Sequence, residues 1–232
     1  FQPIKERLTN RLFENDWESK LTHNEIALSL VKTIEDFAED LKLYLSDEII
    51  LKKVFDRIIA TTVGVYIQNL MLKARKMRKN MIKRKKGFQN STRAVSRMQK
   101  DIEIMKDFFL EEASNLPSLS RTIQQEFSPL NAIFEFVTII PSATSSDIKG
   151  FVSAMMQVTG NFDLTRRMLL DLCLLFAPKK QRIVNQTMLS IKKDLVHERL
   201  QNRGNQPQVL RFVTLLANLY GIKEERLAMC WK

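Results

Sequence analysis

Apolar residues recur at helical spacing along a stretch without proline, residues 47–86, which we expect to form the longest helix of the chain. As one helix it would be about 60 Å long, more than a compact core is wide. Only Gly64 interrupts it. We predict that its first half is the spine of an antiparallel helical array. The apolar face of this spine consists of Ile50, Leu51, Val54, Phe55, Ile58, Val63, Tyr66, Ile67, Leu70 and Met71.

Two shorter amphipathic helices are predicted ahead of the spine. Pro3 suits the first turn of a helix that would run to about residue 20. The segment from Thr22 to Glu25 has the pattern of a capping box, so the next helix should begin at Thr22. Ser46 or Asp47 would cap the spine helix. The inward positions of the second short helix would be Ile26, Leu30, Ile34, Phe37, Leu41 and Leu45.

A further amphipathic helix is predicted from Ser91, with apolar residues at alternating intervals of three and four, as in a bundle seam. These apolar residues are Val95, Met98, Ile102, Met105 and Phe109. The acidic residues of this segment are expected on its outer, solvated face. They are Asp101, Glu103, Asp107, Glu111 and Glu112.

The remaining sequence predicts more helices, separated by proline, glycine and capping residues. Ser128 and Pro129 form a start signal for a helix over residues 130–140, and Ser145 or Ser146 would cap the one after it. The other expected helices cover residues 148–159, 163–176, 179–201, 207–221 and 223–232. No β-hairpin signal is present. We therefore predict an all-α protein of about nine helices in two bundles, residues 1–116 and 117–232.

The net charge of +11 is concentrated in one place. Residues 73–86 hold nine Lys or Arg and no acid, and without these nine the chain has 28 basic and 26 acidic residues. A nucleic-acid domain usually spreads its positive charge over a face. The candidate contact residues are Lys73, Arg75, Lys76, Arg78, Lys79, Lys83, Arg84, Lys85 and Lys86.

Three interpretations of this basic run stay open. It can be a solvated helix end, or it can project from the bundle and contact anionic lipid or an acidic partner surface. Nucleic acid is the least favoured, because no aromatic residue lies between Lys73 and Lys86 to stack on bases.

The sequence offers no catalytic constellation and no cofactor motif. Cys173 lies in an apolar run, where a buried structural thiol is expected, and His23 and His197 have no metal-spaced neighbour. No apolar run is long enough to span a membrane. We therefore expect a cytosolic non-enzyme without a cofactor. Because the chain begins at Phe1 and not at Met, we expect a longer parent protein.

The order of four segments resembles the C-terminal region of the exocyst subunit Sec6 family. The segments are RMQKDIEIMKDFF (97–109), SPLNAIFEFVTII (128–140), SDIKGFVSAMMQV (146–158) and FDLTRRMLLDLCLLF (162–176). The resemblance covers roughly residues 47–192 and consists of packing motifs, so no binding residue carries over.

This resemblance implies an elongated stack of antiparallel helical bundles, of the tethering-complex rod type. It implies a non-catalytic subunit that holds secretory vesicles at the plasma membrane before SNARE-mediated fusion. The implied partners are other exocyst subunits, a plasma-membrane t-SNARE and a Sec1/Munc18-type protein. The implied location is cytoplasmic, peripheral at plasma-membrane sites of secretion, which are the bud tip and bud neck in a fungus. The alternative is a basic helical module that binds anionic membrane or nucleic acid.

Overall fold

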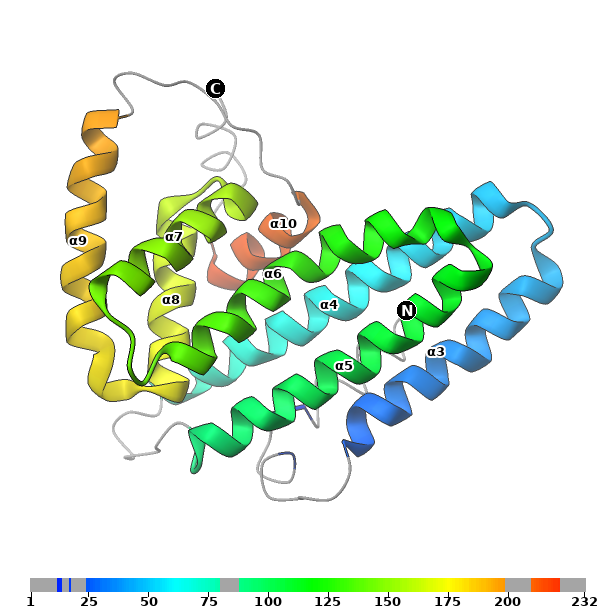
Figure 1. Cartoon of the computed structure of the whole chain (residues 1–232), viewed down its shortest axis with the longest axis horizontal. Coiled ribbons are helices and arrows are strands. Elements are labelled where there is room, and N and C mark those ends of the chain that lie inside the picture. The colour runs from blue at the N-terminus through cyan, green and yellow to red at the C-terminus, as the bar shows by residue number, and fades with distance from the viewer. Residues whose placement is uncertain (1–11, 14–16, 18–23, 80–87, 199–209, 222–232) are drawn as a thin grey trace. The chain divides into compact units, whose positions relative to one another are not determined.

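The computed structural model describes residues 12–13, 17, 24–79, 88–198 and 210–221, and within these ranges the chain is helical and contains no strand (Figure 1). This confirms the all-α prediction. The predicted helices over residues 3–20 and 223–232 lie mostly or wholly outside the described ranges. The elements are α3 (Glu25–Tyr44), α4 (Glu48–Lys79), α5 (Ser91–Asn115), η2 (Pro117–Leu119), α6 (Ser120–Ile139), α7 (Ser145–Thr159), α8 (Phe162–Phe176), η3 (Pro178–Lys180), α9 (Gln181–Glu198) and α10 (Leu210–Tyr220).

The chain forms two compact units that are not continuous in sequence. The first comprises Phe1–Leu70 and Thr92–Leu130, and the second comprises Met71–Ser91 and Asn131–Lys232. Helices α4 and α6 therefore each contribute to both units. The predicted division between residues 116 and 117 stays a prediction.

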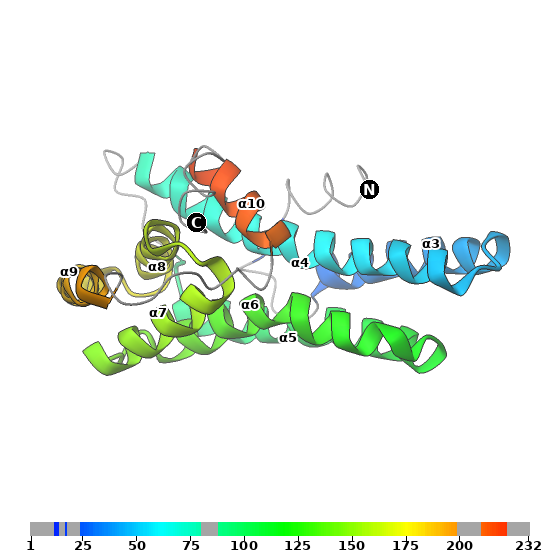
Figure 2. The same ribbon diagram turned by 90° about the horizontal axis from the view of Figure 1, so that it is seen from above.

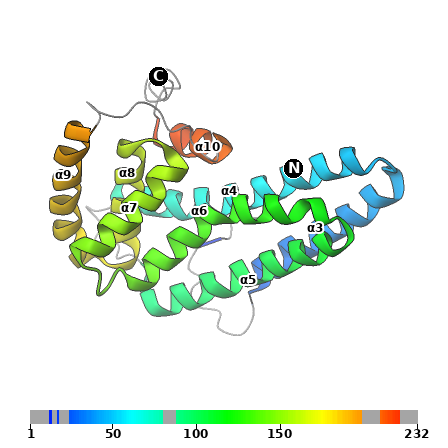
Figure 3. The same ribbon diagram turned by 45° about the horizontal axis from the view of Figure 1, so that its top comes forward.

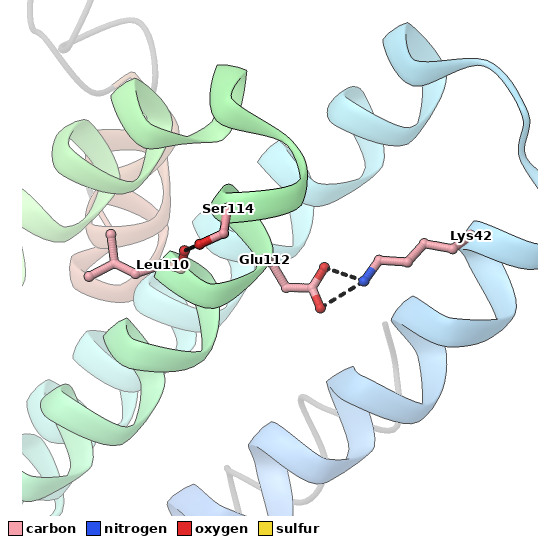
Figure 4. A network of polar contacts seen from close by, with 4 residues as sticks. All are labelled: Lys42, Leu110, Glu112 and Ser114. Atoms are coloured by element: carbon pink, nitrogen blue, oxygen red, sulfur yellow. Dashed lines mark hydrogen bonds and ion pairs between the residues drawn. The ribbon is translucent and has the colours of Figure 1, made fainter.

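The first unit is built from two helical hairpins, α3 with α4 and α5 with α6 (Figures 1 and 3). Successive helices run in opposite directions, so α3 and α5 are parallel to each other. An ion pair joins these two helices, with Lys42 Nζ 2.7 Å from Glu112 Oε2 (Figure 4). Thr122 of α6 donates to Asp56 of α4 at 2.7 Å.

Helix α3 differs from its predicted form at its start and on its buried face. It begins at Glu25, not at Thr22, and the side chain of Asn24 makes no cap bond. The residues that turn inward are Ala27, Leu30, Ile34 and Ala38. Phe37 was expected inside, but 51% of it is exposed. Ala38, the next residue along the helix, is buried in its place.

The predicted cap of the spine helix is confirmed for Asp47. Its Oδ1 accepts from the backbone N–H groups of Ile49 and Ile50 at 2.8 and 3.3 Å, which satisfies two amides of the first turn. In its middle α4 is buried on nearly every side, from Thr62 to Ile67, as a central helix should be.

The acidic face predicted for α5 is wrong at two of its five positions. Asp101 is fully buried, and Glu112 is 9% exposed. Asp101 follows Met98 by three residues and precedes Met105 by four, so it lies within the apolar seam. The other three acids are exposed as expected.

The start predicted for α6 is also wrong. The helix begins at Ser120 and contains Pro129 in its interior. A proline there removes one backbone hydrogen bond and normally breaks a helix. The apolar stripe nevertheless continues through it, because Ile123, Phe127 and Leu130 are all buried at helical spacing. Burial of this stripe offsets the missing bond.

In the second unit, α7 packs against α8, α9 and α10, and α8 packs against α9 and α10. Figure 2 looks nearly along the axes of α8 and α9. Helix α7 starts from Thr144, which forms a capping box with Asp147, in place of the predicted serine caps. It ends as predicted at Gly160, whose φ of 60° favours glycine.

Candidate partner-contact site

The candidate contact site consists of the nine Lys and Arg side chains in the segment 73–86. The structure describes four of these side chains. Lys73 is half-buried, and its ammonium lies 4.8 Å from the centroid of the Phe88 ring. Arg75 is also half-buried, whereas Lys76 and Arg78 are exposed. Lys79 is the last described residue of α4, without a described side chain. Lys83, Arg84, Lys85 and Lys86 lie outside the described residues.

Arg75 and Arg78 bind other parts of the second unit through polar contacts. Arg75 donates to the backbone carbonyl of Leu219, and its guanidinium carbon lies 6.0 Å from the centroid of the Tyr220 ring. Arg167 of α8 donates to the carbonyl of Tyr220 at 3.0 Å. Two arginines thus pair with carbonyls at the C-terminal end of α10, where the helix dipole favours positive charge.

The second internal contact of the basic run is to a buried carboxylate. Asp171 is fully buried in α8, and it forms an ion pair with Arg78 and accepts from the Tyr220 hydroxyl at 2.7 Å. Burial raises the pKa of Asp171, while the Tyr220 bond and the positive charges of Arg78, Arg75 and Arg167 oppose that rise. The same carboxylate, together with burial, raises the pKa of Tyr220.

These contacts show that the first part of the basic run is packed within the second unit. Ala74 and Met77 are buried, at 0% and 8% exposure, and Arg75 and Arg78 hold α10 and α8. Contact of the nine basic residues with a partner or with lipid is not tested by these contacts and stays a prediction.

The first unit contains a second buried carboxylate, which the sequence analysis had placed outside. Asp101 accepts from Trp17 Nε1 at 2.9 Å, from Asn24 Nδ2 at 2.6 Å and from the Tyr66 hydroxyl at 3.1 Å. The guanidinium carbon of Arg97 lies 5.8 Å from the centroid of the Trp17 ring. This cluster joins α5 to α4 and to the segment ahead of α3.

Burial raises the pKa of Asp101 to about 6, although its three hydrogen bonds and the charge of Arg97 stabilise the carboxylate. Burial and the neighbouring Asp101 also raise the pKa of Tyr66. We assign the cluster a structural role, because the carboxylate of Asp101 accepts three hydrogen bonds from side chains of the same unit.

Cys173 is a further residue whose chemistry the sequence raised. Cys173 is buried as predicted, and burial raises the pKa of its thiol to about 12. A thiol with that pKa is a poor nucleophile near neutral pH. Among the described residues, no three His, Cys, Asp or Glu side chains converge in a way that could hold a metal ion. The described helices include none long and apolar enough to cross a membrane.

One feature of the sequence could have located both buried acids. Asp101 and Asp171 both fall at apolar positions of an otherwise regular helical pattern, beside Met98 and Ile102 and beside Met168 and Leu172. An acid at such a position needs nearby donors. Their donors come from segments distant in sequence, so the partners themselves could not be predicted.

The described part of the chain is an all-α protein. Its two buried carboxylates, Asp101 and Asp171, connect helices to one another. Comparison with known proteins identifies the family. The sequence profile of the family described as exocyst complex component Sec6 matches residues 6–158, about two thirds of the chain. The chain belongs to this family, as the resemblance predicted, and it is therefore a component of the exocyst, a tethering complex. Comparison with curated proteins and with solved structures gave no significant match.

Proposed function

We propose that the chain is a non-catalytic exocyst subunit that holds secretory vesicles at the plasma membrane before SNARE-mediated fusion. The family match over residues 6–158 is the observation that carries this proposal. The internal use of Asp101, Asp171 and Cys173 supports it, since each is satisfied or shielded by packing. The proposed partners are other exocyst subunits, a plasma-membrane t-SNARE and a Sec1/Munc18-type protein. The proposed location is cytoplasmic, peripheral at sites of secretion, and at the bud tip and bud neck in a fungus.

A reconstituted tethering assay tests this function. Exocyst assembled with or without the subunit that contains this chain would be mixed with secretory vesicles and plasma-membrane sheets, and fusion would be blocked by a soluble SNARE fragment. We expect vesicle capture with the complete complex and a marked loss without the subunit. Equal capture in both cases would contradict the proposal. Direct binding of the chain to the t-SNARE and to the Sec1/Munc18-type protein would be measured separately.

A second proposal concerns the basic run. The last four cations of the run, Lys83, Arg84, Lys85 and Lys86, follow Arg75 and Arg78, which bind inside the second unit. We infer that they contact an acidic partner subunit or the anionic inner leaflet, where each cation near the surface adds about 1 kcal/mol. Replacing Lys83, Arg84, Lys85 and Lys86 by Glu should weaken that contact and leave the melting temperature nearly unchanged.

Vesicle flotation and subunit co-precipitation, each at low and physiological salt, distinguish the two contacts. The matched control is reversal of the exposed pair Lys192 and Lys193 to Glu on α9. If the quadruple variant behaves as wild type in both assays, the run is a solvated helix end. Binding to a DNA or RNA duplex that falls steeply with salt would instead favour nucleic acid.

A further inference from the structure

The tip of the α3–α4 hairpin exposes a group of large apolar side chains. Leu43 and Tyr44, in the last turn of α3, are 75% and 78% exposed, and Ile49 and Ile50, in the first turn of α4, are 66% and 46% exposed. Only residues 45–48 separate the two pairs, so the four residues lie at the same end of the hairpin. We call these four residues the apolar tip.

Such a group is not needed for folding of the hairpin itself. The inward face of α3 is formed by Leu30, Ile34 and small residues, and α4 begins its buried stripe at Phe55. Large apolar residues exposed in a contiguous group mark surfaces that bind other molecules. Tyrosine and large apolar residues are also frequent at the centres of protein interfaces.

The surroundings of the apolar tip are strongly acidic. Residues 35–48 contain six acids and one base, a net charge of −5 in a chain of +11. The one base, Lys42, has its ammonium 2.7 Å from Glu112 (Figure 4). The acids are all exposed, and they are Glu35, Asp36, Glu39, Asp40, Asp47 and Glu48.

We propose that the apolar tip docks an amphipathic helix of another exocyst subunit, one whose apolar face is bordered by Lys and Arg. The apolar side chains would supply the core of the contact and the acids a complementary rim, which gives specificity and faster association. A second copy of this chain fits less well, because two acidic rims would then face each other. An anionic membrane is also disfavoured, because its negative headgroups would repel the acidic rim. This inference rests on the proposed assembly with other subunits and is independent of the basic run.

The test measures affinity for each of the other exocyst subunits, purified singly. The apolar variant is Leu43→Ser with Ile49→Ser, and its control is Leu189→Ser, which changes a residue 55% exposed on α9. We expect the apolar variant to lose about tenfold or more in affinity for one subunit, as central interface residues do. The control should stay within about twofold of wild type, as surface substitutions usually do.

A second variant tests the acidic rim. Reversal of Glu39 and Asp40 to Lys should weaken the same complex at low salt, and less so at high salt, because exposed charges are screened. Its control reverses Glu103 and Asp107, which are exposed on α5. Each variant must keep the melting temperature of wild type, so that lost binding is not lost folding.

The outcomes separate this inference from the proposed function. If a subunit binds and neither variant weakens that binding, the proposed docking surface is wrong, but the proposed function stands. Failure of the wild-type chain to bind any exocyst subunit overturns both. Sedimentation of the chain as a dimer that Leu43→Ser with Ile49→Ser dissociates would identify a second copy as the occupant, and that also overturns the inference. Flotation with vesicles lost in the same variant would overturn it in favour of lipid.

Discussion

The carboxylate of Asp101 is held by one indole, one amide and one hydroxyl, all from outside its own helix. Hydrogen bonds of this kind to a charged group contribute more than those between neutral groups, about 1.5–3 kcal/mol each. Burial nevertheless dominates, and it raises the pKa of Asp101 to about 6. The first unit therefore contains an acid that titrates well above the ordinary range of aspartate.

This pKa predicts how stability changes with pH. In the unfolded chain an aspartate has a pKa near 4, so the folded state binds the proton more tightly between about pH 4 and pH 6. The contribution of Asp101 is full below about pH 4 and is lost as the pH rises through 6. The difference in unfolding free energy between wild type and Asp101→Asn should change by roughly 3 kcal/mol across this window. Denaturant melts at several pH values measure it, and two parallel profiles would contradict the assignment.

The core of the second unit gives a prediction of a different kind. Phe136, Leu169 and Leu172 were expected to be buried, and their exposures are 1%, 0% and 0%. Replacing any of them by Ala should lower the unfolding free energy by about 2–5 kcal/mol. Leu189→Ala, at a residue 55% exposed, is the control and should change it by less than about 1 kcal/mol. An equally small effect at Leu169 would mean that this packing is wrong.

At the scale of helices, the start of α7 depends on Thr144. Its hydroxyl accepts from the backbone of Asp147, and the Asp147 carboxylate accepts from the backbone of Thr144 at 2.7 Å. These bonds lower the pKa of Asp147. Thr144→Ala should destabilise the protein by about 1 kcal/mol. Ser146→Ala, at a residue that the sequence offered as an alternative cap, should be nearly neutral, and a larger loss there than at Thr144 would contradict the cap.

The attachment of α10 depends on the arginines of α4 and α8. Arg78→Ala would leave the buried carboxylate of Asp171 without its ion pair, although Tyr220 still donates to it. We expect faster hydrogen exchange at the amides of α10 in this variant, because loss of a buried ion-pair partner is strongly destabilising. Arg182→Ala removes an exposed arginine on α9 and is the control. Unchanged exchange in α10 would show that the ion pair does not hold this helix.

Helix boundaries show how far the sequence alone can predict this fold. The helices α5 and α8 were predicted closely, because their apolar spacing and their end signals agree. For α6 the two disagreed, since Pro129 looked like a start while the apolar stripe began at Ile123. The stripe was the better guide, because its burial involves many contacts and the proline removes a single hydrogen bond.

The candidate site was predicted less well than the fold. Composition located the positive charge of residues 73–86, but it could not show that Arg75 and Arg78 bind within the second unit. Those contacts join positions 93 or more residues apart in sequence. Periodicity also could not show that Phe37 faces water while Ala38 faces the core. Phe37 and Ala38 follow Ile34 by three and four residues, and both spacings place a residue on the same face of a helix.

Over the whole chain, charge is distributed unevenly. Residues 73–86 hold nine cations, whereas residues 35–48 carry a net charge of −5. A subunit that assembles with several different partners can use such separate surfaces of opposite sign for different contacts. Direct binding of nucleic acid would instead use positive charge alone, and the contact would weaken steeply with salt.

The most direct test of the account is co-precipitation of the purified chain with each of the other exocyst subunits over a series of salt concentrations. Because apolar side chains are proposed to form the core of the contact with another subunit, we predict that at least one subunit is retained at physiological salt and well above it. Retention of none of them would contradict the account, as would binding only to nucleic acid or anionic vesicles that disappears as the salt concentration rises.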